Sequence, residues 1–151
     1  RAMNELIPRE VARSNRLGSS LTFMTLDLNG FRNINAKFGT LEGDTLLAEF
    51  GRMMKSVFRG GDIVFRQGGD EFLVLMPGTD ARAGRVGCER IREAFEGEAW
   101  ERIAPGLRVT ASIGVASTEA PGDLEALVSL ADQRLYDAKH AGRNCVVAAT
   151  G

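Results

Sequence analysis

A short apolar segment interrupted by GGDE constrains this chain more than any other feature of its sequence. Residues 63–77, IVFRQGGDEFLVLMP, consist of two apolar runs on either side of that tetrapeptide. Such a pattern is typical of two antiparallel strands joined by a tight hairpin. The turn accounts for the two glycines, but it does not account for the adjacent carboxylates of Asp70 and Glu71, whose like charges repel each other. The segment therefore raises a question about function as well as about fold.

The rest of the chain predicts helices that alternate with strands. Helical periodicity or helix-capping residues mark residues 3–16, 30–39, 43–58, 79–98 and 122–142. Strand-forming residues fill residues 21–28, 106–119 and 144–149. One hairpin, with the other strands reached through helices, predicts an α+β fold of the ferredoxin-like type. In such a fold, helices pack around a mixed, partly antiparallel central sheet.

Several helix boundaries are expected at particular residues. Asp44 and Asp123 are placed to open the helices at residues 43–58 and 122–142, because a side-chain carboxylate can accept a hydrogen bond from the first helical turn. Thr79-Asp80 is a start signal for the helix at residues 79–98. Gly39 and Gly142 are placed to end the helices at residues 30–39 and 122–142. Pro8 is awkward in the first helix unless it falls in the first turn or kinks the helix.

Composition limits the class of protein. The chain has 151 residues, 44% of them apolar, and a net charge of −1, which predicts one globular domain without broad affinity for nucleic acids or membrane surfaces. Cys88 and Cys145 fit no metal-binding spacing and are expected to be reduced thiols. No signal peptide or membrane-spanning run is present, so we expect a cytoplasmic domain. Because the chain starts without Met inside a helical pattern, we expect a piece of a longer protein, for which a membrane anchor is left open.

Three carboxylates are candidates for a metal site. Asp27 lies near the end of an apolar strand, and Asp70 and Glu71 lie at the tip of the hairpin. If these strands are neighbours, the three acids gather at one edge of the sheet, where a cation would relieve their repulsion. Oxygen ligands suit Mg²⁺ or Mn²⁺, which would in turn hold a phosphate. From the hairpin alone, ordinary turn chemistry with solvated acids remains an equal alternative.

Two features of the sequence are candidates for phosphate binding. Lys139 and Arg143 lie four residues apart at the close of the last helix. They could clamp a phosphate, although their spacing alone is better explained by the preference of basic residues for helix C-termini. Gly30, between Asn29 and Phe31, would let backbone N–H groups approach an anion closely, which is a weak signal by itself.

The chain resembles a known family over most of its length. The motif GGDEF occupies residues 68–72, and LDLNGFRNINAKFGTLEGDTLL, TASIGVA and ADQRLYDAKHAGRN follow the pattern of GGDEF domains, the diguanylate cyclases, over nearly the whole chain. The resemblance implies the sheet fold of class III nucleotide cyclases and the polymerase palm. It also implies that two GTP molecules are joined into cyclic di-GMP with release of two pyrophosphates. Each protomer of a homodimer would bind one GTP.

The resemblance also implies roles for individual residues. Asp27, Asp70 and the Leu28 carbonyl would be the metal ligands, and Glu71 would lie near the attacking 3′-hydroxyl group as a base or metal-site partner. The terminal phosphates would be held by Gly30, Phe31, Arg32, Lys139 and Arg143. The guanine base would be held by Asn35 and Asp44. A carboxylate at Asp44 suits guanine, because adenine would leave this buried acceptor unpaired. A role for Asp44 as a simple helix cap remains an alternative.

A second site is implied by the tetrapeptide RGGD. Arg59 and Asp62 match the R-x-x-D motif through which the family binds its product as an inhibitor, and Arg90 matches a position that often supplies a further arginine. Guanidinium groups suit phosphate and guanine edges. We therefore expect cyclic di-GMP to be both product and allosteric inhibitor of this domain.

The chain departs from the family pattern at a few positions. Asn29 and Ala36 replace common aspartates, Thr40 replaces a histidine, and Arg32 replaces a lysine. None of these changes removes an implied metal ligand, but they leave the catalytic rate open. Two alternatives to an active cyclase are a silent module that senses GTP or cyclic di-GMP and a purely structural dimerisation domain. An upstream regulatory domain is expected outside this chain, and no nucleic-acid polymer is expected as a partner.

Overall fold

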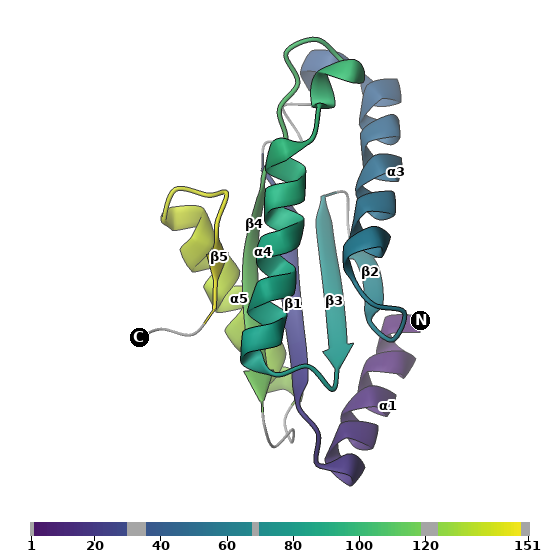
Figure 1. The fold of residues 1–151 in the computed structure, drawn as a ribbon, viewed down its shortest axis with the longest axis vertical. Helices are drawn as coiled ribbons and strands as arrows, with labels where there is room; N and C mark the ends of the chain where they lie inside the picture. Colours follow the sequence, from purple (N-terminus) through teal and green to yellow (C-terminus); the bar gives the residue numbers. More distant parts are fainter. Residues whose placement is uncertain (1, 30–35, 68–69, 119–123, 149–151) are drawn as a thin grey trace.

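Within the residues that the computed structural model describes, 2–29, 36–67, 70–118 and 124–148, five strands form one mixed sheet (Figure 1). The strands are β1 (Leu21–Leu28), β2 (Ile63–Gln67), β3 (Glu71–Pro77), β4 (Ala111–Thr118) and β5 (Val146–Val147). The helices are α1 (Ala2–Leu17), α3 (Thr40–Val57), α4 (Ala81–Gly97) and α5 (Leu124–His140), with a short 3₁₀ helix, η1 (Trp100–Arg102). The strand order across the sheet is β2-β3-β1-β4-β5.

The strand β1 lies in the middle of the sheet. It pairs antiparallel with β3 on one side and with β4 on the other, whereas β5 joins β4 in parallel. Every residue of β1 except Asp27 is buried, as expected for a nearly continuous apolar strand that is covered on both faces. The predicted α+β fold with a mixed, partly antiparallel sheet is therefore confirmed.

Helices cover both faces of the sheet (Figure 1). On one face, α3 and α4 contribute to a core that includes Met24, Leu26, Phe50 and Phe95. On the other face, α5 and α1 pack over a smaller core that includes Phe23, Leu75, Val11, Leu127 and Ala131. Among the helices that the structure describes, none has the length and apolar composition that a membrane span requires.

The prediction that Asp44 caps α3 is wrong. The helix begins earlier, at Thr40, and its N-cap is Gly39, which has a positive φ of 97° and makes no side-chain hydrogen bond. This glycine separates α3 from the helical residues 36–38, so the position of the helix start is decided by its backbone conformation. Asp44 is consequently an exposed residue within α3. The predicted start signal Thr79-Asp80 is confirmed, because Asp80 caps α4 and accepts a hydrogen bond of 2.9 Å from a backbone N–H of the first turn. Asp123 lies outside the described residues.

Other boundaries differ from prediction for reasons of packing. The strands β4 and β5 are shorter than the predicted segments 106–119 and 144–149. Leu107 and Val109 are buried although they lie in an irregular connection, which explains why their apolar character suggested a strand. The helix α1 continues through Pro8. Gly142, with a φ of 111°, follows α5 as expected for a residue that ends a helix.

Gly114 lets α5 pack directly against the backbone of β4. A Cβ atom at this position would lie 2.2 Å from the carbonyl oxygen of Ala131 and 2.3 Å from the backbone nitrogen of Leu135. No side chain fits between the two elements here, so the position of α5 above the sheet depends on this glycine. Lys139, in the last turn of α5, is positioned by the same contact.

We predict that Gly114→Ala lowers the free energy of unfolding by about 1–3 kcal/mol or more, the cost of overpacking, because the backbone of α5 must move away from β4. The matched control is Gly51→Ala within α3, where nothing lies within 4 Å of an added Cβ. It should raise stability by about 0.5–1 kcal/mol. Urea unfolding followed by circular dichroism measures both changes. Equal midpoints for the two variants would contradict the close packing at Gly114.

Candidate functional site

The pairing of β1 with β3 brings the candidate carboxylates to one end of the central strands. Asp27 lies opposite Glu71, and the backbone N–H of Leu28 donates a hydrogen bond of 3.0 Å to the carbonyl oxygen of Asp70. On the other side, Asp27 lies opposite Ser112 of β4. Within the described residues, no three His, Cys, Asp or Glu side chains form a group that could hold a metal by themselves. A cation bound here would therefore rely on one or two carboxylates and on ligands from outside the chain.

Asp27 has a largely buried carboxylate that is paired with a lysine. Burial raises the pKa of this carboxyl group, contact with the ammonium group of Lys139 opposes the shift, and the nearby charge of Asp70 adds to it. The Asp27 side chain is only 18% exposed, and its Oδ2 atom forms an ion pair with Lys139. Its Oδ1 atom is buried and accepts no hydrogen bond within the described part of the chain. Asp27 is thus a desolvated carboxylate with one oxygen still available to a cation.

Glu71 is held by a residue that sequence reasoning missed. Thr25 is fully buried in β1, and its hydroxyl group donates a hydrogen bond of 3.2 Å to Oε2 of Glu71. Burial raises the pKa of Glu71; the hydrogen bond from Thr25 opposes the shift and the charge of Asp27 adds to it. The available signal was a polar residue in an apolar strand, two positions before Asp27 and therefore on the same face of the sheet.

Asn29 connects the end of β1 to β4 through the nitrogen and the oxygen of its side-chain amide. Its Nδ2 group donates to the hydroxyl oxygen of Thr110 at 2.8 Å, and its Oδ1 atom accepts from the hydroxyl group of Ser112 at 2.9 Å. Its backbone N–H also donates to the carbonyl oxygen of Thr110 at 3.0 Å. A carboxylate could not donate to Thr110, so Asn29 is a structural anchor at the position where the family often has aspartate.

The predicted substrate-binding residues are only partly described. Gly30, Phe31, Arg32 and Asn35 lie outside the described residues, and so does the Gly-Gly pair of the hairpin tip. Asp44 is exposed within α3, and its carboxylate does not cap that helix. The roles of these residues remain predictions.

Lys139 and Arg143 both lie at the C-terminal end of α5, but their environments differ. The ammonium group of Lys139 contacts Asp27. The position of Lys139 is therefore explained by this ion pair as well as by the preference of basic residues for helix C-termini. Arg143 follows the helix, is exposed, and has a positive φ of 65°. The structure thus places one of the two predicted phosphate-binding cations directly on a predicted metal ligand.

The three residues of the predicted product site line one small cavity. Arg59, Asp62 and Arg90 surround a volume of about 190 Å³ next to the start of α4. The guanidinium group of Arg59 lies 3.4 Å from Asp62, donates to the carbonyl oxygen of Pro77 at 3.2 Å, and contacts the hydroxyl group of Thr79. Asp62 also accepts a hydrogen bond of 2.9 Å from the backbone N–H of Arg59. The structure therefore brings together all three residues that the sequence singled out for this site.

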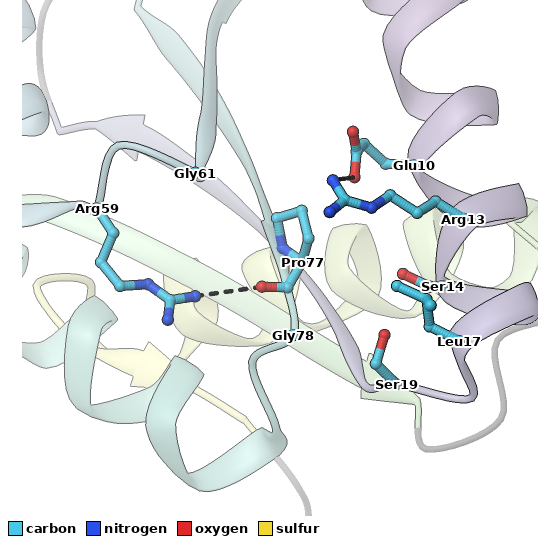
Figure 2. A pocket seen from close by; sticks show the side chains of 9 residues that line it. All are labelled: Glu10, Arg13, Ser14, Leu17, Ser19, Arg59, Gly61, Pro77 and Gly78. Carbon is cyan, nitrogen blue, oxygen red and sulfur yellow. Dashed lines mark hydrogen bonds and ion pairs between the residues drawn. The ribbon is translucent and has the colours of Figure 1, made fainter.

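A larger cavity, which the sequence did not indicate, lies on the other side of Arg59. It has a volume of about 450 Å³ and is lined by residues of α1, of the turn before β2 and of the end of β3 (Figure 2). Figure 2 shows that Arg59 and Arg13 approach it from different elements. The guanidinium group of Arg13 lies 4.0 Å from Glu10, whose Oε1 atom is buried and accepts no hydrogen bond from the described residues. Arg59 therefore lines this cavity as well as the one that it shares with Asp62 and Arg90.

Comparison with known proteins identifies the family. Residues 1–145 match the family described as diguanylate cyclase, GGDEF domain, and the chain belongs to this family. It is 38% identical over 143 residues, 95% of this chain, to diguanylate cyclase DgcP of Pseudomonas aeruginosa. The chain spans 21% of the length of that relative.

Solved structures agree with the assignment of the fold. The active GGEEF domain of a diguanylate cyclase from Vibrio cholerae superposes with a TM-score of 0.85 at 28% identity, covering 94% of this chain and 92% of that one. The GGDEF domain of DgcB from Caulobacter crescentus, solved in complex with c-di-GMP, superposes with a TM-score of 0.89 at 24% identity. This second match covers 97% of this chain and 87% of that one, and it supports the fold alone.

We predict that Lys139→Met lowers the free energy of unfolding by about 1–3 kcal/mol, because it leaves the buried carboxylate of Asp27 beside Asp70 without a cation. Adding Asp27→Asn to this variant should recover part of the loss. Lys55→Met is the matched control, since Lys55 also lies in the last turn of a helix and is exposed. Chemical unfolding at neutral pH measures all three. An equal loss for Lys139→Met and Lys55→Met would mean that Lys139 acts only on its helix terminus.

Proposed function

We propose that this domain is a diguanylate cyclase that condenses two GTP molecules into cyclic di-GMP and two pyrophosphates. The observation that carries the proposal is the juxtaposition of Asp27, Asp70 and Lys139 at one end of β1, in a chain that belongs to the GGDEF family. Phosphoryl transfer depends on in-line placement and on charge neutralisation more than on covalent groups of the protein. The desolvated carboxylate of Asp27, with the charge of Asp70 and the ammonium group of Lys139 beside it, supplies the charges that this chemistry uses.

The carboxylates of Asp27 and Asp70, with the carbonyl oxygen of Leu28, would hold Mg²⁺ or Mn²⁺. The fit rests on Asp27: its Oδ1 atom accepts no hydrogen bond from the described residues, and its pKa is raised by burial and by the charge of Asp70. All of these donors are oxygens, which magnesium prefers, and a site with few protein ligands leaves room for phosphate oxygens. When bound, the cation supplies neutralising charge to the phosphates during the transfer.

The chain's own cations would hold the triphosphate. Lys139 and Arg143 would contact the terminal phosphates, together with Arg32 and the backbone N–H groups of Gly30 and Phe31. In the structure, the ammonium group of Lys139 forms an ion pair with Asp27. We propose that this ammonium group contacts a phosphate oxygen once GTP and its cation neutralise the acids.

Glu71 would accept the proton of the attacking 3′-hydroxyl group. Its pKa is raised by burial, which makes it a better proton acceptor than an ordinary carboxylate, and Thr25 fixes one of its oxygens. The 3′-oxygen of one GTP would form a bond to the α-phosphorus of the other, and the bond to pyrophosphate would break. The same step, with the roles of the two nucleotides exchanged, would close the ring. Two protomers, each carrying one GTP, would face each other.

Recognition of the base and of the product would use separate residues. Asn35 and Asp44 would read guanine. The carboxylate of Asp44 is exposed and not buried as expected from the sequence, so it is accessible to a base, and it would become a buried acceptor only beneath the bound guanine. Arg59, Asp62 and Arg90 would bind cyclic di-GMP as an allosteric inhibitor, which their shared cavity supports.

We further propose that this chain is one domain of a multidomain signalling protein, with a regulatory domain elsewhere in the same protein. The support is that DgcP is about five times longer than the matching region, since the chain covers 21% of it. With GTP as the substrate, the reaction would take place in the cytoplasm.

We predict that the purified domain, incubated with GTP and Mg²⁺, forms cyclic di-GMP and pyrophosphate, and that Asp70→Ala lowers the rate at least about a hundredfold. Glu125→Ala, which removes an exposed carboxylate from α5, is the control and should retain the wild-type rate. If the separate domain forms no product, the assay is repeated with the domain fused to a dimeric coiled coil. No product from the fused dimer, together with retained GTP binding, would overturn catalysis in favour of a nucleotide sensor.

We predict that Arg90→Ala weakens the binding of cyclic di-GMP about tenfold, because it removes one of the guanidinium groups that line the product cavity. Isothermal titration calorimetry measures the affinity directly. Arg85→Ala, an exposed arginine of the same helix that does not line this cavity, is the control. Equal affinities for the two variants would exclude Arg90 from the product site.

A further inference from the structure

The turn after α5 has a backbone conformation that needs an explanation. Arg143 and Asn144 have φ angles of 65° and 47°, directly after Gly142 at 111°. In this left-handed region the Cβ of an ordinary residue approaches the following carbonyl oxygen, so two consecutive non-glycine residues are unfavourable there. Asparagine tolerates the conformation better than most residues, whereas arginine has no such advantage. Strained backbone of this kind persists only where surrounding contacts determine it.

The two ends of the turn are fixed by backbone hydrogen bonds. The N–H of Arg143 donates to the carbonyl oxygen of Ala138 at 3.0 Å, which continues the end of α5. The carbonyl oxygen of Cys145 accepts from the N–H of Ile113 at 3.0 Å, which attaches the following residues to β4. These bonds set where the turn begins and ends, but neither contacts the side chain of Asn144.

The side chain of Asn144 is held by α4 from the other direction. Its Nδ2 group donates to Oε2 of Glu96 at 2.8 Å, and its Oδ1 atom accepts from Nη1 of Arg92 at 3.2 Å. Arg92 also donates to Oε1 of Glu96 at 3.1 Å, so the three side chains form a closed ring of hydrogen bonds. The ring is further fixed by Glu89, which accepts from Nε of Arg92 at 2.8 Å. The hydrogen bond from Asn144, with that from Arg92, holds the pKa of Glu96 below its usual value.

Asparagine is the residue type that meets both demands at position 144. Glycine would accept the left-handed backbone but would make no contact with α4. Aspartate would place a carboxylate against that of Glu96. An amide both donates to Glu96 and accepts from Arg92, and it adopts the required backbone conformation.

We propose that Glu96 and Arg92 are positioning residues for Arg143: through Asn144 they fix the left-handed turn that directs the exposed guanidinium group of Arg143 to the terminal phosphates of the bound nucleotide. The proposal rests on the proposed function, in which Arg143 and Lys139 share the triphosphate. Lys139 is fixed by α5 itself, whereas Arg143 lies beyond the end of that helix and needs support from another element. The ring of side chains on α4 provides this support.

The test compares the affinities of two guanine nucleotides that differ in their terminal phosphates. The probes are guanosine 5′-[α,β-methylene]triphosphate, which cannot release pyrophosphate, and GMP, each measured by calorimetry with Mg²⁺. Wild-type protein should bind the triphosphate more tightly than GMP, and Arg143→Ala should reduce this preference. Glu96→Ala should raise the Kd for the triphosphate about tenfold and leave the Kd for GMP unchanged. In the Arg143→Ala background, Glu96→Ala should have no further effect.

A charge-exchanged pair provides a rescue. Asn144→Asp alone opposes two carboxylates and should lose the triphosphate preference. Adding Glu96→Gln restores a donor and an acceptor in reversed order, and should recover it. Glu93→Ala is the matched control, because Glu93 also lies near Arg92, at 3.8 Å, but makes no contact with Asn144. It should behave like the wild type.

Three results would overturn the inference while leaving the proposed function intact, namely an unchanged triphosphate affinity in Glu96→Ala, an equal loss for both nucleotides, and additive losses with Arg143→Ala. If Arg143→Ala itself has no effect, both the inference and the role of Arg143 as a phosphate ligand are wrong. If the wild-type protein shows no preference for the triphosphate, the proposed function fails and the inference fails with it.

Discussion

The antiparallel pairing of β1 with β3 is the constraint on which the rest of the structure depends. It places Asp27 opposite Glu71 and beside Asp70, at a partly buried end of the central strands. Carboxylates brought together with little water need a positive charge. Lys139 supplies it in the structure, and it reaches Asp27 because α5 packs against β4 without an intervening side chain at Gly114. The electrostatics of the site therefore depend on the packing of α5 against the sheet.

The helix α4 connects two parts of the molecule that the sequence presents as unrelated. Arg90 lines the cavity that also contains Arg59 and Asp62. Further along the helix, Glu96 holds Asn144, next to the predicted phosphate ligand Arg143. One amphipathic helix, buried through residues such as Ile91 and Phe95, thus presents polar groups to both regions. Its packing against the sheet fixes both sets of side chains at once.

The sequence predicted what depends on local patterns and missed what depends on tertiary contacts. The strands β1 and β2 cover the predicted residues, because continuous apolar runs and the GGDE turn mark them clearly. The start of α3 was mispredicted, since it depends on the positive φ of Gly39. The hydrogen bond from Thr25 to Glu71 and the ion pair between Lys139 and Asp27 join residues far apart in the chain, and no periodicity encodes them. The carboxylates and basic residues themselves suggested metal and phosphate sites, whereas the individual ligand roles and the guanine contacts came from family resemblance; all of these roles stay predictions.

The central claim is that Asp27 and Asp70 form a cation site that Lys139 neutralises until nucleotide binds. The most direct measurement is a crystal structure of the domain with Mn²⁺ and guanosine 5′-[α,β-methylene]triphosphate, using the anomalous signal of manganese to locate the ion. The account predicts an anomalous peak for a manganese ion that is coordinated by oxygens of Asp27 and Asp70. It also predicts that the ammonium group of Lys139 contacts a phosphate oxygen. Manganese bound elsewhere, or Lys139 still paired with Asp27 beside a bound nucleotide, would contradict it.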